Sequence, residues 1–188
     1  MKNNNKGFSL VEVLIVSFFL VLLVVAVVTS GVEMRSVFQA TGTSATLQQE
    51  ARIALNVIIS DLRGSSMSVI NITEDSPASG FDKITYKIPL DVNDDGVPDL
   101  VAGNVTWDSQ YYTVEAQSDG SDYDLVKYKL WESPEVISEN IKSITFEDST
   151  DDTSLYPTEV RITLELEKID GDGRVNSIVL KSTVNTRI

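Results

Sequence analysis

The chain has 188 residues, no cysteine and no histidine, and its 28 acidic against 15 basic residues give a formal net charge of −13. The missing side chains exclude disulfide bonds, thiolate and histidine metal sites, and catalytic triads that need a histidine or a cysteine nucleophile. An acidic surface repels phosphate groups, so we expect no direct binding to nucleic acid.

The first predicted element is an apolar helix near the N-terminus. Residues 13–28 read VLIVSFFLVLLVVAVV, in which Ser17 is the one polar residue, and Glu12 is the one charged residue between Phe8 and Val32. About 20 consecutive apolar residues are enough to cross a bilayer as a helix. The run therefore predicts a transmembrane helix over residues 8–32.

A short basic leader, residues 1–7, precedes this helix and sets its orientation. It carries Lys2 and Lys6 and no acidic residue. The positive charge predicts a cytoplasmic N-terminus in a single-pass membrane protein, with residues 33–188 forming an extracytoplasmic domain. A cleaved secretory signal is the alternative. However, the apolar run is longer than the usual signal core of about 7–15 residues, and Thr29-Ser30-Gly31 is a poor cleavage site.

The next predicted element is an amphipathic helix at about residues 44–63, which ends near Gly64. Its apolar residues recur every three or four positions and would face a sheet: Leu47, Ala51, Leu55, Ile58 and Leu62. We expect this helix to continue the apolar one without a break. Two helices joined by a loop at Gly42 are the alternative.

The rest of the chain alternates between apolar and polar residues, as strands do. The predicted strands are Asp82–Leu90, Tyr111–Ala116, Leu125–Trp131, Ser143–Glu147, Glu159–Ile169 and Asn176–Asn185. Asp170-Gly171-Asp172-Gly173 predicts a hairpin turn between the last two. Three Ser- and Asp-rich segments predict exposed loops: Thr73–Gly80, Gln117–Asp124 and Glu147–Ser154. The fold class is therefore α+β, a long N-terminal helix packed on an antiparallel sheet.

An acidic segment between two predicted strands has the spacing of a calcium loop. It reads D-x-N-x-D-G-x-x-D, and the oxygen ligands would come from Asp91, Asn93, Asp95, the Val97 carbonyl and Asp99. Oxygens at alternate positions can converge on Ca²⁺, which takes 6–8 of them at about 2.3–2.6 Å. We expect a weak, structural calcium site here. The alternative is a solvated acidic turn, since Asp, Asn and Gly favour turns anyway.

The N-terminal residues K-G-F-S-L-V-E-V-L-I, from Lys6 to Ile15, resemble the prepilin-type cleavage and methylation signal of type IV pilins and type II secretion pseudopilins. The resemblance implies that a prepilin peptidase cuts between Gly7 and Phe8, and that the new Phe8 amine is methylated. It also implies that Glu12 pairs with the Phe8 amine of a neighbouring subunit during assembly.

Later fragments resemble the same family more loosely. The order of LQQEARIALNVIISDLRGSS, LVKYKLW, EVISENIKSITFE, YPTEVRITLEL and STVNTRI is most similar to W-type minor pilins and J-type pseudopilins. The resemblance implies a pilin-like fold and a structural subunit of a type IV pilus or type II secretion pseudopilus. Its partners would be other pilin subunits, prepilin peptidase, the inner-membrane assembly platform and membrane lipid.

Two other functions stay open: a filament-tip subunit that binds a surface or substrate, and a simple membrane-anchored calcium-binding domain. Catalysis is not expected, because the sequence holds neither a glycine-rich phosphate loop nor a nucleophile elbow.

Overall fold

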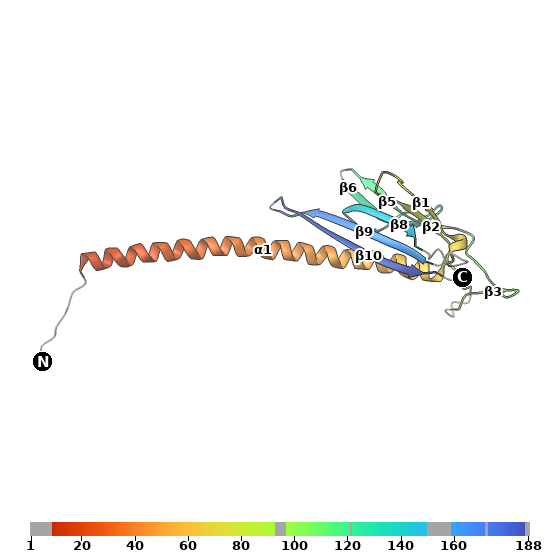
Figure 1. Cartoon of the computed structure of the whole chain (residues 1–188), viewed down its shortest axis with the longest axis horizontal. Helices are drawn as coiled ribbons and strands as arrows, with labels where there is room; N and C mark the ends of the chain where they lie inside the picture. The colour runs from red at the N-terminus through yellow and green to blue at the C-terminus, as the bar shows by residue number, and fades with distance from the viewer. Residues whose placement is uncertain (1–8, 93–96, 121, 150–158, 172, 187–188) are drawn as a thin grey trace, which may run out of the picture. The chain divides into compact units, whose positions relative to one another are not determined.

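The computed structural model describes residues 9–92, 97–120, 122–149, 159–171 and 173–186. The fold is α+β, as predicted (Figure 1). Over the described residues it contains one long helix, a single turn of 3-10 helix and ten strands. The chain divides into two compact units, Met1–Gly42 and Thr43–Ile188.

Helix α1 spans Leu10–Gly64 without a break. It runs through Gly42, so the prediction of one continuous helix is confirmed and the alternative loop at Gly42 is wrong. A single glycine costs a helix only about 1 kcal/mol relative to alanine, which is too little to end it. The helix ends at Gly64 as predicted, where the Ser65 amide donates to the Leu62 carbonyl at 3.1 Å.

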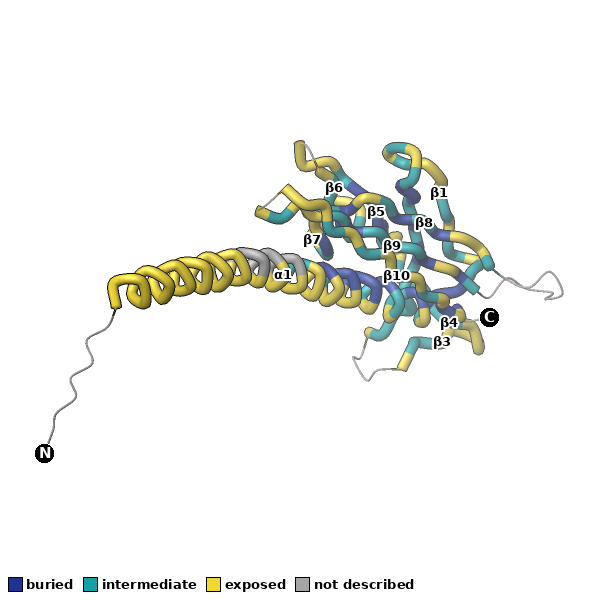
Figure 2. Tube along the Cα trace, turned by 60° about the vertical axis from the view of Figure 1, so that its left-hand side comes forward, coloured by how far each residue is buried: buried dark blue, intermediate teal, exposed yellow. Residues whose placement is uncertain are grey.

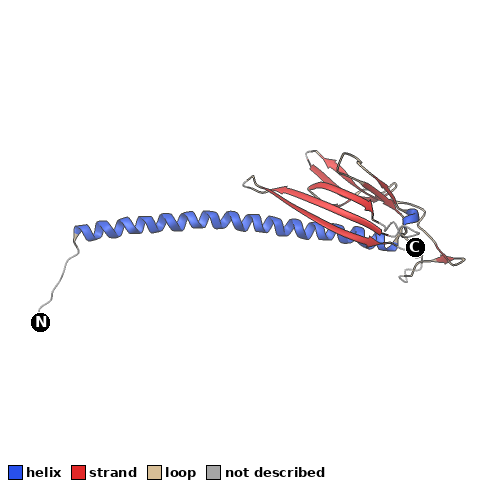
Figure 3. Ribbon diagram, in the orientation of Figure 1, coloured by secondary structure: helices blue, strands red, loops and turns tan. Residues whose placement is uncertain are grey.

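The strands form antiparallel pairs in three sheets (Figure 3). The order of the five-stranded sheet is β1-β2-β5-β6-β7, that of the three-stranded sheet is β10-β9-β8, and β3 pairs with β4. The bounds are β1 Asn71–Thr73, β2 Lys83–Tyr86, β3 Leu100–Val101, β4 Asn104–Val105, β5 Tyr112–Asp119, β6 Asp122–Lys129, β7 Glu135–Ser138, β8 Ile141–Asp148, β9 Glu159–Ile169 and β10 Val175–Asn185. The short 3-10 helix η1 spans Met67–Val69.

Several strand predictions need correction. The single predicted sheet is two main sheets, and β2 covers only part of Asp82–Leu90. The predicted loop Gln117–Asp124 is wrong, because β5 and β6 pair through it as far as Asp119 and Asp122. The β9–β10 hairpin is confirmed, and at its turn the Asp170 amide donates to the Arg174 carbonyl at 2.9 Å.

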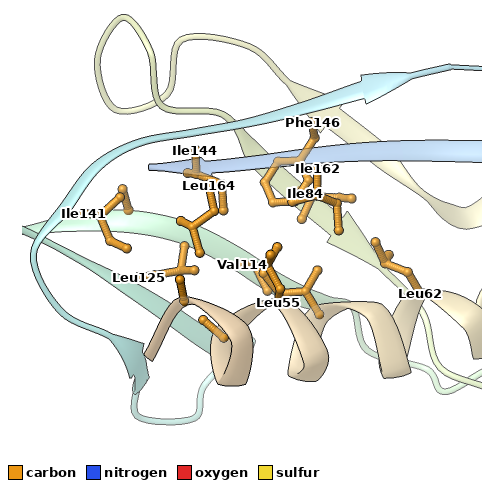
Figure 4. Close-up of a cluster of buried hydrophobic side chains, with 14 of the residues drawn as sticks. Leu55, Leu62, Ile84, Val114, Leu125, Ile141, Ile144, Phe146, Ile162 and Leu164 are labelled. Carbon is orange, nitrogen blue, oxygen red and sulfur yellow. The ribbon is translucent and has the colours of Figure 1, made fainter. Parts of the chain in front are cut away.

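The core of the second unit lies between the C-terminal half of α1 and the two main sheets (Figure 4). All five residues of the predicted helix stripe are buried: Leu47, Ala51, Leu55, Ile58 and Leu62. They meet the inward-facing residues of alternating strands, among them Ile84, Val114, Leu125, Ile144, Ile162 and Leu164. The apolar face of the helix and the apolar faces of the strands therefore pack into one core, as the sequence pattern predicts.

The two main sheets are joined near Asp82. The Asp82 amide donates to the Ile144 carbonyl at 2.8 Å, and the Ile144 amide donates to the Gly80 carbonyl at 3.1 Å. The Asp82 carboxylate accepts from the Phe146 amide at 2.9 Å and from the Asp75 amide at 3.1 Å. Asp82 is buried, so one side chain links the segment before β2 to strand β8.

Candidate functional site: an apolar helix and an acidic loop

The apolar half of α1 is long enough to cross a membrane. Its segment Leu10–Gly31 has 22 residues and a mean hydropathy of 3.1, and its residues are exposed (Figure 2). At about 1.5 Å per residue this segment is about 33 Å long, against about 30 Å for the hydrocarbon core of a bilayer. By length and composition, such a helix could span a membrane or serve as a signal sequence.

Glu12 lies in the first turn of α1 and contacts the start of the helix. Its Oε2 accepts a hydrogen bond from the Ser9 amide at 3.2 Å, and the Val13 amide donates to the Ser9 carbonyl at 3.2 Å. Ser9 thus takes the N-cap position, and Glu12 supplies the returning bond of a capping box. An acidic residue here also suits the positive end of the helix dipole. The predicted processing residues Gly7 and Phe8 lie outside the described residues.

The hydroxyl groups of the apolar segment are satisfied inside the helix. Ser17 donates to the Leu14 carbonyl at 2.9 Å, and Ser30 donates to the Ala26 carbonyl at 2.9 Å. Thr29 donates to the carbonyls of Val25 and Ala26, both at 3.0 Å. Such bonds remove the need for water around a polar group in lipid. Glu12 differs from these residues, because a charged carboxylate is costly in the hydrocarbon region unless it pairs with a cation or lies at the membrane–water interface.

The acidic loop is described in part. Asp91, Val97 and Asp99 lie within the described residues, while Asn93 and Asp95 lie outside them. Asp99 closes the loop: its amide donates to the Leu90 carbonyl at 2.8 Å, and its Oδ2 accepts from the Val92 amide at 3.0 Å. Within the described parts of the chain, no three acidic side chains gather as a metal site would require. Calcium binding stays a prediction.

One polar cluster was not predicted from the sequence. Asp61, on the C-terminal half of α1, forms an ion pair with Lys127 of β6 and accepts a 2.6 Å hydrogen bond from the hydroxyl of Tyr86 on β2. Tyr86 is fully buried, and its ring stacks on Tyr112 at 5.9 Å between centroids. Burial, reinforced by the Asp61 carboxylate, raises the pKa of Tyr86 well above its usual value. The cluster fixes the helix to the five-stranded sheet.

The spacing of Ser9 and Glu12 is the sequence signal that would have found the capping bond, because Ser-x-x-Glu before an apolar run is typical of a helix start. The Asp61 cluster has no such signal, since its members come from three elements that meet only in the fold. Comparison with protein-family models, with curated proteins and with solved structures finds no match to this chain.

Proposed function

We propose that this chain is a structural minor pilin or pseudopilin, a subunit of a type IV pilus or a type II secretion pseudopilus. The observation that carries the proposal is the exposed apolar segment Leu10–Gly31, which has Glu12 in its first turn and belongs to a chain with a separately packed α+β unit. The prepilin-type residues Lys6–Ile15 support the same assignment.

The apolar segment needs a second apolar surface. A helix that is apolar on all faces is stable in lipid or among other such helices, and exposure to water is unfavourable. Before assembly, membrane lipid would cover it, with the N-terminus in the cytoplasm. In the filament, the same segments of neighbouring subunits would replace the lipid. The assembly platform of the inner membrane would move the subunit from one environment to the other.

Glu12 would set the register between neighbouring subunits. Cleavage between Gly7 and Phe8 by prepilin peptidase creates a positive amine at Phe8, which is then methylated. A carboxylate and an amine about 4 Å apart attract by about 4 kcal/mol where the effective dielectric constant is about 20. The bond from Ser9 to Glu12 holds the carboxylate at the helix start, where a neighbour's amine would meet it.

The test compares three variants in cells with an active prepilin peptidase. Glu12→Val and Glu12→Gln should insert into the membrane and be cut normally, and their yield in sheared filaments should fall at least about tenfold, since about 1.4 kcal/mol already gives that factor. Ser17→Val is the matched control, because it removes a polar group of the same helix without removing a charge.

The mass of the intact membrane-extracted protein and of its N-terminal peptide provides the second readout. A mature chain that starts at methylated Phe8 supports the pilin assignment. An uncut chain in the same cells, or a normal filament yield of Glu12→Val, contradicts it.

Calcium is a second, separate part of the proposal. The bonds from Val92 to Asp99 and from Asp99 to Leu90 bring the two ends of the acidic loop together. Asp91, Asn93, Asp95, the Val97 carbonyl and Asp99 would then supply hard oxygen ligands, which suit Ca²⁺. The ion would order the loop and would take no part in catalysis.

A further inference from the structure

The five-stranded sheet carries a groove on the face turned away from the core. Ile84 and Val114 are paired in the sheet and buried beneath it. Their neighbours Thr85 and Thr113 are also paired, and because successive side chains alternate across a strand they lie on the opposite face. A groove of about 520 Å³ opens over these two threonines. This volume is within the range of small-molecule sites, about 300–1,000 Å³.

Five residues with neutral hydrogen-bonding side chains contribute to a groove wall whose exposed surface is mostly apolar. Asn71, Ser109 and Gln110 line it together with the two threonines. The Thr85 hydroxyl donates to the Asn71 carbonyl at 3.4 Å, so its oxygen keeps its capacity to accept. Hydroxyl and amide groups of this kind can both donate to and accept from a ligand rich in hydroxyls.

The charge in the groove is compensated. Lys83 is the one charged residue of the lining, and its Nζ lies 3.2 Å from the Glu115 carboxylate. Glu115 also accepts from the Tyr128 hydroxyl at 2.8 Å and from the Gln117 amide at 3.2 Å. Burial opposes the ionisation of Glu115, but these bonds hold its pKa below the usual value. Burial and the same carboxylate raise the pKa of Tyr128 to about 12, so its phenol stays a neutral donor.

Apolar and aromatic surface lies beside these polar groups. Tyr111 lines the groove and is 47% exposed, and the Lys87 Nζ lies over its ring, 4.7 Å from the centroid. Leu130 also lines it and starts the turn after β6, which closes through the bond from the Glu132 amide to the Lys129 carbonyl at 3.0 Å. The next residue, Trp131, has a φ of 74° and is 91% exposed. A positive φ of this size favours glycine and is strained for tryptophan, and because the indole is exposed, its burial does not offset that strain.

We propose that this groove binds a neutral carbohydrate, with the hydroxyl and amide side chains bonded to sugar hydroxyls and the Tyr111 ring against a sugar face. Lys83, the charged residue of the lining, is already paired with Glu115, and Lys87 beside the groove lies over the Tyr111 ring. Neither lysine therefore favours an anionic ligand over a neutral one, and a cationic ligand would meet no free carboxylate in the lining. A peptide added as a strand needs a free sheet edge, whereas this groove lies over paired strands. The inference is independent of the filament role, and each can fail without the other.

The test is isothermal titration calorimetry of the full chain in a zwitterionic detergent that has no sugar headgroup. The probes are maltohexaose, cellohexaose and the tetramer of N-acetylglucosamine. At least one probe should bind saturably with a Kd of about 0.1–1 mM, a range that corresponds to a modest binding energy. Tyr111→Ala and Thr85→Val should weaken this binding about tenfold or more, while Tyr111→Phe, which keeps the ring, should retain it.

Thr183→Val is the matched control, because Thr183 is exposed on β10 of the other sheet. Circular dichroism of each variant shows that the fold is kept. Absence of heat with all three sugars overturns the proposal, and so does binding that Tyr111→Ala and Thr85→Val leave unchanged. Saturable binding of an uncharged hexapeptide without any sugar binding would assign the groove to peptides and would also overturn it.

Discussion

The hydroxyl of Tyr86 donates a 2.6 Å hydrogen bond to Oδ2 of Asp61, the same oxygen that is ion-paired with Lys127. The three side chains come from a helix and from two strands of one sheet. Because Tyr86 is fully buried, its polar atom would be costly without this partner. The cluster therefore specifies how the helix stripe is placed on the sheet, in addition to the apolar contacts.

Tyr86→Phe should lower the free energy of unfolding by about 1.5–3 kcal/mol, the usual contribution of a hydrogen bond to a charged group. Urea unfolding of the full chain in micelles, followed by near-ultraviolet circular dichroism, measures the change. Tyr111→Phe is the control, since that residue is half exposed and should change stability by less than about 0.5 kcal/mol. Equal stabilities of the two variants would show that the buried bond contributes nothing.

Alkaline pH should destabilise the protein through the same tyrosine. The folded-state pKa of Tyr86 is raised above the unfolded value near 10.0, so its contribution is fully present below that pH. Above it, the unfolded chain loses the Tyr86 proton while the native chain keeps it. The unfolded state then binds fewer protons, and stability falls by up to about 1.4 kcal/mol per pH unit. Unfolding measured from pH 9 to 11 should show a shallower fall in Tyr86→Phe than in the native sequence, and parallel curves would contradict this.

Asp82→Ala should be the more damaging change. It leaves the buried amide of Phe146 without its acceptor and also removes the part-buried hydrogen bond from the Asp75 amide. An unsatisfied buried donor costs about 1–3 kcal/mol and an ordinary hydrogen bond contributes about 0.5–1.5 kcal/mol, so we expect a loss of about 2–4 kcal/mol. Glu74→Ala, in the exposed segment nearby, is the control for loss of one acidic side chain. Equal shifts of the urea midpoint in the two variants would show that the Asp82 hydrogen bonds between the two sheets do not stabilise the fold.

Calcium should bind the full chain with a Kd of about 10⁻⁴–10⁻³ M, the range of weak extracellular sites. Asp99→Asn should weaken binding, because an amide oxygen can still accept the bond from Val92 but carries no charge for the ion. Glu132→Gln removes one exposed negative charge elsewhere and is the matched control. A calorimetric titration with no heat at millimolar Ca²⁺ would leave the segment a plain acidic turn.

The parts of the fold that could be predicted are those in which apolar residues repeat with the period of a helix or a strand. The stripe from Leu47 to Leu62 was correct because a helix with one buried face repeats every three or four residues. The β9–β10 hairpin was correct because a glycine-rich turn separates two long alternating runs. The segment Gln117–Asp124 was mistaken for a loop because the tip of a hairpin is exposed to solvent and its residues are polar. Alternation also cannot show which strands pair, so the division into two sheets was missed.

The candidate site was predictable only where its residues are neighbours in the chain. The capping bond of Glu12 follows from a local spacing. The groove over Thr85 and Thr113 collects residues from Asn71 to Leu130, which only the sheet brings together. No local pattern marks such a site.

The pairing of β10 with β9 does not depend on the redox state of the compartment in which the protein folds. Strand β10 is paired with β9 at all eleven of its residues, from Val175 to Asn185, and Val184 near its end is buried. With no cysteine in the chain, the C-terminal strand is held by hydrogen bonds and packing alone. Strand β10 can therefore pair with β9 under either oxidising or reducing conditions, and no enzyme that forms disulfide bonds is required.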